Sequence, residues 1–279
     1  MEKIREAVER ARASYSSSKS QILENLGLPA RHIERSAASL SMSGPQIDET
    51  ELNLAHLLSK RVISHDAADQ RSRPYDMLRT QVLQAMSPNG WKILAVTSPT
   101  SGCGKTLTAV NLAFSISRQQ GQSVALLDID LQKPQIANCL GITPAEGGVL
   151  GLLNEQTTLQ SAMIPVRAGS QRMFVLPTVP TRESSELMGS RAMRSLLQDL
   201  RRDYQTVIVD LPPILPSDDV ISVLPEIDCV ILVAAVGHSK VSEVEECLRH
   251  LQSSAVVRLV LNKATDSNSN YYTAYTAAG

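Results

Sequence analysis

An apolar run, a loop with two glycines and a helical pattern follow one another at residues 92–117, and they constrain the fold more than any other stretch. The run is KILAVT at residues 92–97, and the loop is SPTSGCGKT at residues 98–106. Where such a loop joins a strand to a helix, its backbone N–H groups converge on phosphate oxygens and the helix dipole adds partial positive charge. The sequence therefore predicts a site for a nucleoside triphosphate.

The loop departs from the strict phosphate-binding pattern at one position. Pro99 stands six residues before Lys105, where that pattern has its first glycine. We expect Lys105 on the β- and γ-phosphates and the Thr106 hydroxyl on Mg²⁺. A turn ahead of an amphipathic helix is the alternative, which the flanking strand and the acidic residues described below disfavour. The predicted nucleotide-binding residues are Ser101, Gly102, Cys103, Gly104, Lys105, Thr106 and Leu107.

Composition and charge limit the class of protein. The 279 residues are 43% hydrophobic and only 3% aromatic, so we expect an aliphatic core. A formal net charge of -1 argues against nucleic acid as a main partner. No apolar stretch approaches roughly 18 residues and no signal-peptide core is present, which predicts a cytoplasmic protein. The four cysteines lack metal-ligand spacing and are expected to be reduced; Cys103 is read as a small loop-filling residue, with a redox-sensitive thiol as the alternative.

Strand and helix patterns alternate through the rest of the chain. Strands are predicted at residues 92–97, 123–127, 173–176, 206–209, 229–234 and 257–261. Helices are predicted at residues 71–86, 107–118, 185–202 and 239–252. This alternation predicts an α/β fold of the P-loop NTPase type, a mostly parallel sheet flanked by helices on both faces.

Acidic residues follow two of the predicted strands. Asp128 and Asp130 come after one strand, and Asp210 comes after another. Ligands of parallel sheets bind at the carboxyl ends of the strands, where carboxylates can hold Mg²⁺ directly or through water. A single aspartate there is more often a turn or a helix cap. Two such sites beside a Gly-Lys-Thr loop favour a metal site instead.

The two ends of the chain differ from its middle. Residues 1–70 are predicted to form a helical, partly flexible arm, either docking on a partner or solvated. Residues 265–279 are polar and are predicted to form a flexible tail. Three of the six tyrosines lie in that tail, where their hydroxyls could reach another molecule's active site; a sticky disordered end is the alternative. These residues are Tyr271, Tyr272 and Tyr275.

Three motifs resemble the Walker A, Walker A′ and Walker B motifs of bacterial tyrosine kinases, the autokinases of capsule and exopolysaccharide synthesis. They are TSPTSGCGKT at residues 97–106, LDIDLQKP at residues 127–134 and VIVDLPP at residues 207–213. That family has a P-loop fold shared with the partitioning ATPases, and the resemblance implies a kinase domain at residues 71–264. Thr100 stands where partitioning ATPases carry a signature lysine, which favours the kinase branch.

The resemblance implies an ATP-dependent protein-tyrosine kinase that uses Mg²⁺ and phosphorylates its own C-terminal tyrosines in trans. The implied catalytic residues are Lys105, Asp128 and Asp130. The implied metal ligands are Thr106, Asp128 and Asp210, and the implied phosphate acceptors are Tyr271, Tyr272 and Tyr275. Which aspartate, Asp128 or Asp130, orients or deprotonates the tyrosine stays open at this point.

The resemblance also bears on partners. In the family a membrane protein supplies an activating segment, so a separate membrane-bound activator or chain-length regulator would recruit this chain to the inner face of the membrane. The family's ring-assembly helix carries one Glu and two Arg; the corresponding residues here are Arg73, Asp76 and Arg79, so both a homo-oligomer and a monomer stay open. Gln132 replaces a family arginine, which predicts reduced or partner-dependent turnover.

Two other classes of function stay open. An ATPase of the partitioning type would hydrolyse ATP without making phosphotyrosine. A nucleotide-gated scaffold for polysaccharide export would bind ATP and barely turn it over.

Overall fold

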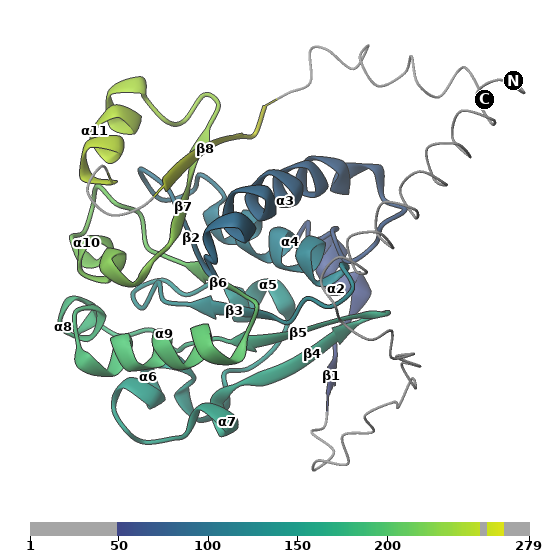
Figure 1. The fold of residues 1–279 in the computed structure, drawn as a ribbon, viewed down its shortest axis with the longest axis horizontal. Helices are drawn as coiled ribbons and strands as arrows, with labels where there is room; N and C mark the ends of the chain where they lie inside the picture. The colour runs from purple at the N-terminus through teal and green to yellow at the C-terminus, as the bar shows by residue number, and fades with distance from the viewer. Residues whose placement is uncertain (1–48, 252–255, 265–279) are drawn as a thin grey trace, which may run out of the picture. The chain divides into compact units, whose positions relative to one another are not determined.

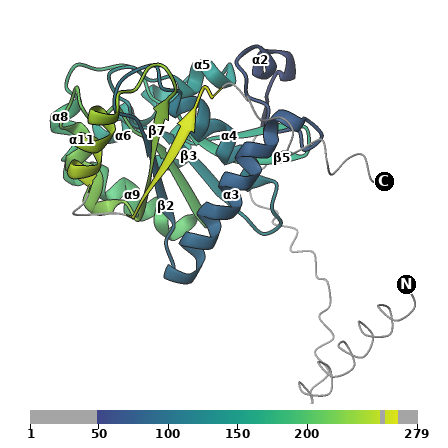
Figure 2. The ribbon, with the colours of Figure 1, turned by 90° about the horizontal axis from the view of Figure 1, so that it is seen from above.

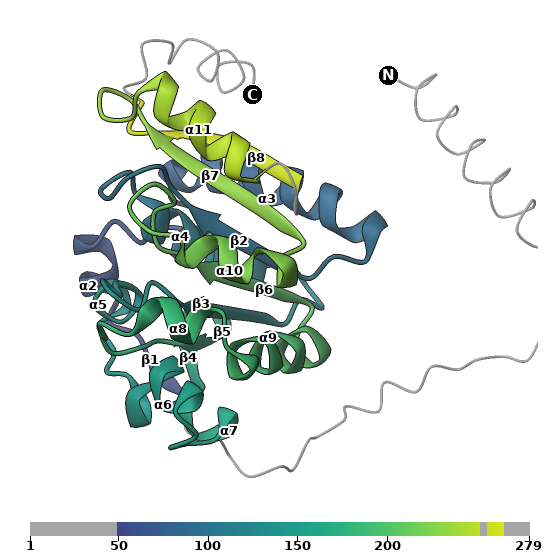
Figure 3. The same ribbon diagram turned by 90° about the vertical axis from the view of Figure 1, so that its left-hand side faces the viewer.

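The computed structural model describes residues 49–251 and 256–264. They form one eight-stranded sheet in the order β1-β4-β5-β3-β6-β2-β7-β8 (Figure 1 and Figure 3). The predictions for residues 1–48 and for Tyr271, Tyr272 and Tyr275 lie outside the described residues. Among the described ones, no helix combines the length and the apolar character needed to cross a membrane.

Four strands in the middle of the sheet are buried along their whole length and run parallel. They are β2 (Ile93–Thr97), β3 (Val124–Asp128), β6 (Thr206–Asp210) and β7 (Cys229–Ala235). Near-continuous aliphatic runs are typical of strands covered on both faces. β6 lies between β2 and β3, so Asp128 of β3 is paired in register with Asp210 of β6.

The outer strands complete a mostly parallel sheet. β5 (Gln171–Leu176) pairs with β3, and β8 (Val256–Asn262) pairs with β7, both in parallel. β4 (Ile164–Ala168) forms an antiparallel hairpin with β5, and β1 (Thr50–Glu51) adds a short parallel edge to β4. The predicted α/β P-loop fold is confirmed.

Helices cover both faces of the sheet (Figure 2), and a separate hydrophobic cluster lies between the sheet and the helices on each face. One face carries α2 (Leu54–Ser59), α3 (Arg73–Met86), α4 (Lys105–Ser117) and α5 (Ile136–Leu140). The other carries α6 (Val149–Leu153), α7 (Leu159–Ala162), α8 (Ser184–Met188), α9 (Arg191–Asp203), α10 (Asp219–Val223) and α11 (Val241–Leu251). Short 3-10 turns lie at Gln70–Ser72, Ser87–Asn89, Ala145–Gly147 and Leu224–Glu226.

The helix predicted at residues 185–202 is two helices. The first ends at Met188 with Gly189 as its C-cap. Ser190 caps the second, since its side chain accepts a hydrogen bond from the Met193 N–H at 3.1 Å. A serine in this position satisfies an N–H group that has no partner inside the helix. The break lets α8 lie beside the cavity described below while α9 packs along the sheet.

The domain boundary expected near residue 70 is wrong, because the segment before it belongs to the same compact unit. Leu52, Leu57 and Val62 are buried in the cluster under α4. The buried Asn111 of α4 accepts hydrogen bonds from the Ile63 and Ser64 N–H groups at 2.8 and 3.0 Å. Thus β1, α2 and the following loop are part of the folded domain.

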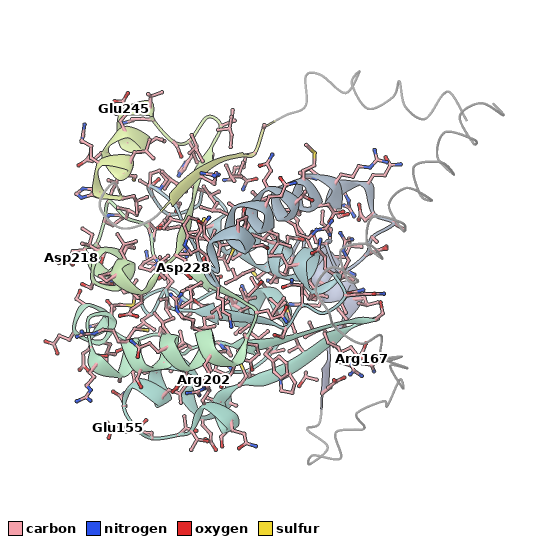
Figure 4. The ribbon with its side chains drawn as sticks, in the orientation of Figure 1. Glu155, Arg167, Arg202, Asp218, Asp228 and Glu245 are labelled. Atoms are coloured by element: carbon pink, nitrogen blue, oxygen red, sulfur yellow. The ribbon has the colours of Figure 1, made fainter. Side chains whose placement is uncertain are left out.

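Asp228 fixes the start of the two central strands that lead to the site (Figure 4). Its Oδ2 accepts hydrogen bonds from the Lys92 and Ile93 N–H groups, both at 2.8 Å, and lies 2.7 Å from Nη1 of Arg201 in α9. This network ties the beginning of β2 to that of β7.

Candidate nucleotide-binding and catalytic site

The loop at residues 98–106 joins β2 to α4, as predicted, and borders a cavity of about 410 Å³. Gly102 and Gly104 have φ angles of 84° and 95°, a region that favours glycine. A Cβ atom at Gly104 would also lie 2.2 Å from Nδ2 of Asn262. The cavity is lined by Ser101, Gly102, Gly104, Lys105, Thr106, Leu107, Asp130, Gln132, Lys133, Gln135, Cys139, Pro212, Pro213, Pro216 and Ser217.

The carbonyl groups of the loop accept hydrogen bonds from protein donors. The Ile214 and Leu215 N–H groups, which follow β6, donate to the first two of them at 2.9 and 3.2 Å. Because C=O and N–H of a trans peptide point in opposite directions, the loop N–H groups are left for a ligand such as a phosphate. The carbonyls with partners belong to Ser98, Pro99, Thr100, Ser101, Cys103 and Gly104.

Lys105 is held by carboxylates from two strands. Its Nζ lies 2.8 Å from Oδ2 of Asp130 and 3.4 Å from Oδ1 of Asp210. Burial disfavours the charge of Lys105, but the Asp210 and Asp130 carboxylates outweigh burial and raise the pKa of the ammonium group above its usual value. A charged lysine therefore stands between the loop and both acidic strand ends.

Asp210, at the end of β6, accepts a hydrogen bond of 2.5 Å from the Thr106 hydroxyl. It is fully buried, and burial raises its pKa to about 6 although Lys105 and Thr106 act to lower it. Leu211 N–H bonds to the Val96 carbonyl at 2.9 Å, so the chain leaving β6 runs alongside β2. Asp210 thus directly contacts both residues of the loop that are expected to handle phosphate and metal.

Asp128 is turned toward the protein interior. Its Oδ2 accepts hydrogen bonds from the N–H groups of Gln135 and Ile136 at 2.9 and 2.8 Å, at the start of α5. Its Oδ1 is buried without a hydrogen-bond partner. Burial, and then the neighbouring Asp210 carboxylate, raise the pKa of Asp128 to about 7. One oxygen of Asp128 is thus used structurally and the other is unsatisfied.

These groups fit a divalent cation. An unsatisfied buried carboxylate oxygen and two carboxylates with raised pKa are the environment that a bound cation relieves. Over residues 49–251 and 256–264, no three His, Cys, Asp or Glu side chains are grouped so as to hold a metal alone. Mg²⁺ commonly keeps several waters and takes phosphate oxygens as ligands, so a hydroxyl and two carboxylates are enough protein groups for it, and Thr106, Asp128 and Asp210 could supply them.

Some of the predicted site residues line the cavity and others do not. All predicted nucleotide-binding residues line the cavity except Cys103, which is buried with its Sγ 3.4 Å from the Ser239 hydroxyl. Asp130 lines the cavity, whereas Asp128 does not. Cys103 can therefore contribute only its backbone to a ligand.

A polar cluster beside the cavity was not predicted from the sequence. Gln132 donates to Ser184 Oγ at 2.9 Å and to Asp219 Oδ2 at 3.3 Å, and the Ser185 hydroxyl donates to Asp219 Oδ1 at 2.5 Å. Asp219 is buried, and Gln132 stabilises its carboxylate with one of these hydrogen bonds. One sequence signal for it was the family arginine that Gln132 replaces.

The charged residues of α3 are used within the chain. Arg79 Nη1 donates to the Ser115 carbonyl at 3.1 Å and to Asp76 Oδ1 at 3.3 Å. Asp76 also accepts hydrogen bonds from the Ser115 hydroxyl, at 2.6 Å, and from Arg118. Asp76 and Arg79 therefore join α3 to α4, and Arg73 is the exposed member of the three.

A family model supports this description of the site. The model for ParA, described as an NUBPL iron-transfer P-loop NTPase, matches residues 90–260. This range includes β2, the loop, α4 and all three aspartates of the site.

Curated relatives of this chain carry names of tyrosine kinases. The putative tyrosine-protein kinase EpsB of Ralstonia nicotianae is 28% identical over 238 residues, which cover 84% of this chain and 31% of EpsB. The putative tyrosine-protein kinase CapB of Staphylococcus aureus is 29% identical over 210 residues, which cover 73% of this chain and 90% of CapB. The chain thus spans about a third of the Ralstonia protein and most of CapB.

Solved kinase domains have the same fold. The VpsO kinase domain is 30% identical, with a TM-score of 0.62 over 70% of this chain and 97% of that domain. The kinase domain of Escherichia coli tyrosine kinase ETK is 25% identical, with a TM-score of 0.65 over 80% of this chain and 94% of that domain. The chain belongs to the bacterial tyrosine kinase family, within the ParA-like P-loop NTPases.

Proposed function

We propose that this protein is an ATP-dependent protein-tyrosine autokinase that regulates capsule or exopolysaccharide synthesis or export. The observation that carries the proposal is the position of Asp130. Its carboxylate lies in the cavity beside the phosphate loop, 2.8 Å from Lys105, where an acceptor hydroxyl could meet a γ-phosphate. An ATPase activates a bound water at this point, whereas a kinase brings a hydroxyl of a second protein segment to it.

In the proposed reaction Lys105 changes partner. When ATP binds, its triphosphate draws the ammonium group away from Asp130, because it carries more negative charge than one carboxylate. Asp130 is then free to accept a hydrogen bond from the tyrosine hydroxyl. ATP would thus both supply the phosphoryl group and release the base.

In the proposed transfer step one bond to the γ-phosphorus forms and another breaks. The tyrosine oxygen forms a bond to the γ-phosphorus, and the bond from that phosphorus to the β–γ bridging oxygen breaks. Asp130 takes the phenolic proton, and ADP leaves with the electron pair of the broken bond. Lys105 and the loop N–H groups stabilise the charge on the phosphate oxygens, since phosphoryl transfer depends mostly on positioning and electrostatics.

We assign the metal to the other two carboxylates. Thr106, Asp210 and the unsatisfied oxygen of Asp128 would hold Mg²⁺, directly or through water, and the ion would neutralise charge on the β- and γ-phosphates. A fold relative at 20% identity, cobyrinic acid a,c-diamide synthase from Mycobacterium smegmatis, has been solved with an ATP analogue and magnesium. With this division Asp130 is the proposed base, and Asp128 is a proposed metal ligand.

Partner and location are part of the proposal. We expect the tail residues Tyr271, Tyr272 and Tyr275 of one chain to be phosphorylated by another copy. A solved fold relative is the chimerical protein CapA2B2. From the family resemblance we expect a separate membrane-bound activator that acts on a cytoplasmic kinase at the inner face of the membrane.

One sample tests the proposal. Purified protein is incubated with ATP and Mg²⁺, and phosphotyrosine and released phosphate are measured together, with Lys105→Met as the control. The kinase proposal is supported if the wild-type protein forms phosphotyrosine and Lys105→Met does not. Phosphate release without phosphotyrosine would make the protein an ATPase of the partitioning type.

A further inference from the structure

His238, which lies in the turn between β7 and α11, contacts the phosphate loop from outside the cavity. Its Nε2 lies 2.9 Å from the Ser101 carbonyl oxygen. A carbonyl can only accept, so Nε2 of the imidazole carries the proton in this hydrogen bond. The contact joins residues 137 positions apart in the sequence.

The turn that carries His238 is itself well fixed. Gly237 has a φ of 70°, and the N–H groups of His238 and Ser239 donate to the Ala235 carbonyl at 3.1 and 2.9 Å. The Ser239 hydroxyl accepts a hydrogen bond from the Ala235 N–H at 3.0 Å and lies 3.4 Å from Cys103 Sγ. The imidazole is therefore presented to the loop from a rigid support.

Asn262, at the end of β8, makes a parallel contact two residues further along the loop. Its Nδ2 donates to the Cys103 carbonyl at 2.9 Å, while its own carbonyl accepts from the Val236 N–H at 3.0 Å. The carboxyl ends of β7 and β8 thus hold two carbonyls of the loop with two side chains. The remaining carbonyl partners come from residues 98–108 and from the segment after β6.

Peptide geometry connects His238 to phosphate. The Ser101 carbonyl and the Gly102 N–H belong to one peptide group and point in opposite directions. A donor that holds the carbonyl outward therefore turns the Gly102 N–H toward the cavity. Gly102 has a φ of 84° and no side chain that could fix this peptide. The hydrogen bond from His238 therefore fixes the orientation of the peptide.

We propose that His238 is a positioning residue for nucleotide binding, which aims the Gly102 N–H at a phosphate oxygen through its hydrogen bond to Ser101. The inference rests on nucleotide binding by the loop, as the proposed function does, and is independent of which acceptor receives the phosphoryl group. His238 touches neither the nucleotide nor the acceptor in this account. It affects the affinity for nucleotide by orienting the phosphate loop.

Binding of a fluorescent ADP analogue with Mg²⁺ tests this role. One exposed hydrogen bond should change affinity by about 2- to 10-fold, so His238→Ala should raise Kd by that factor. His238→Gln, whose amide can donate from nearly the same position, should stay within about 2-fold of wild type. His250→Ala, at an exposed histidine of α11, is the matched control and should leave Kd unchanged.

Hydrogen exchange of the nucleotide-free protein gives a second readout. Amides of residues 98–106 should exchange faster in His238→Ala and return toward wild-type rates in His238→Gln. Wild-type Kd and wild-type exchange in His238→Ala would overturn the inference, as would a Gln variant as weak as the Ala variant. If His238→Ala weakens ADP binding but no phosphotyrosine forms, the kinase proposal fails and the role of His238 stands.

Discussion

The Thr106 hydroxyl donates a 2.5 Å hydrogen bond to Oδ2 of Asp210, and so joins the first turn of α4 to the end of β6. The same carboxylate lies 3.4 Å from Lys105. Binding of a nucleotide and a cation at this point must rearrange contacts that the protein makes with itself. Lys105, Thr106 and Asp210 therefore already contact one another at the place where the ligands are proposed to bind.

Two substitutions of Thr106 distinguish the contribution of its hydroxyl from that of its shape. Thr106→Val keeps the shape and removes the hydrogen bond to Asp210, whereas Thr106→Ser keeps the hydroxyl. We expect Thr106→Val to lose most of the Mg²⁺ dependence of ADP binding, because a proposed metal ligand is removed. Titration of ADP with and without Mg²⁺ measures this. If Thr106→Val and Thr106→Ser show the same Mg²⁺ dependence, the Thr106 hydroxyl is not a metal ligand.

Asp130→Asn removes the proposed base without changing the size of the side chain. General base catalysis contributes about 10²- to 10⁴-fold, so tyrosine phosphorylation should fall by at least about 100-fold. ADP affinity should change by less than about 3-fold, because the residue contacts the loop only through Lys105. Asp218→Asn, at an exposed carboxylate next to the cavity-lining Ser217, is the control; Asp218 is labelled in Figure 4. Equal kinase activity in both variants would exclude Asp130 as the base.

The raised pKa of Asp128 predicts how stability depends on pH. With a folded-state pKa of about 7 against an ordinary value of 3.8, native Asp128 binds its proton more tightly than the unfolded chain does. Its ionisation therefore lowers the free energy of unfolding as pH rises from about 4 through about 7. Asp128→Asn should remove this loss.

Denaturant unfolding of the nucleotide-free protein at pH 5 and pH 8 tests that prediction. Asp128→Asn should raise the free energy of unfolding at pH 8 by about 1–3 kcal/mol, with a smaller gain at pH 5. Glu245→Gln, on the outer surface of α11 (Figure 4), should change neither value by more than about 0.5 kcal/mol. If Asp128→Asn raises the free energy of unfolding more at pH 5 than at pH 8, the predicted direction of the pH dependence is wrong.

Arg79→Ala should weaken the junction of α3 and α4. The variant loses hydrogen bonds to the Ser115 carbonyl and to the half-buried Asp76, so the free energy of unfolding should fall by about 1–3 kcal/mol. The loss should not depend on protein concentration, because both partners lie in the same chain. Arg73→Ala, at an exposed position of the same helix, should have little effect on unfolding. A concentration-dependent loss in Arg79→Ala would instead point to a subunit interface.

Much of this site was predictable because its residues follow strands. The apolar runs before Ser98, Asp128 and Asp210 define three parallel strands, and parallel strands bring their carboxyl ends together. The different roles of Asp128 and Asp130 were not predictable. They depend on α5, whose first N–H groups occupy Asp128 and leave Asp130 facing the cavity.

Other features depend on contacts that sequence spacing does not reveal. β4 was missed because Pro165 and Arg167 interrupt its apolar pattern and it pairs through an antiparallel hairpin. The segment before residue 70 was assigned to an arm because its few apolar residues, such as Leu57, become buried only against α4 and α5. The contact of Asn262 with the loop spans 159 residues, so only the fold brings the two together.

Phosphorylation in trans is the most direct test of the central claim. A Lys105→Met chain with its tyrosines intact is mixed with a chain that keeps Lys105 and carries Phe at Tyr271, Tyr272 and Tyr275, and ATP and Mg²⁺ are added. Mass spectrometry should then find phosphotyrosine in the tail of the Lys105→Met chain and none when either chain is incubated alone. Phosphotyrosine that forms on the Lys105→Met chain alone, or its absence from the mixture while ATP is hydrolysed, would contradict the account.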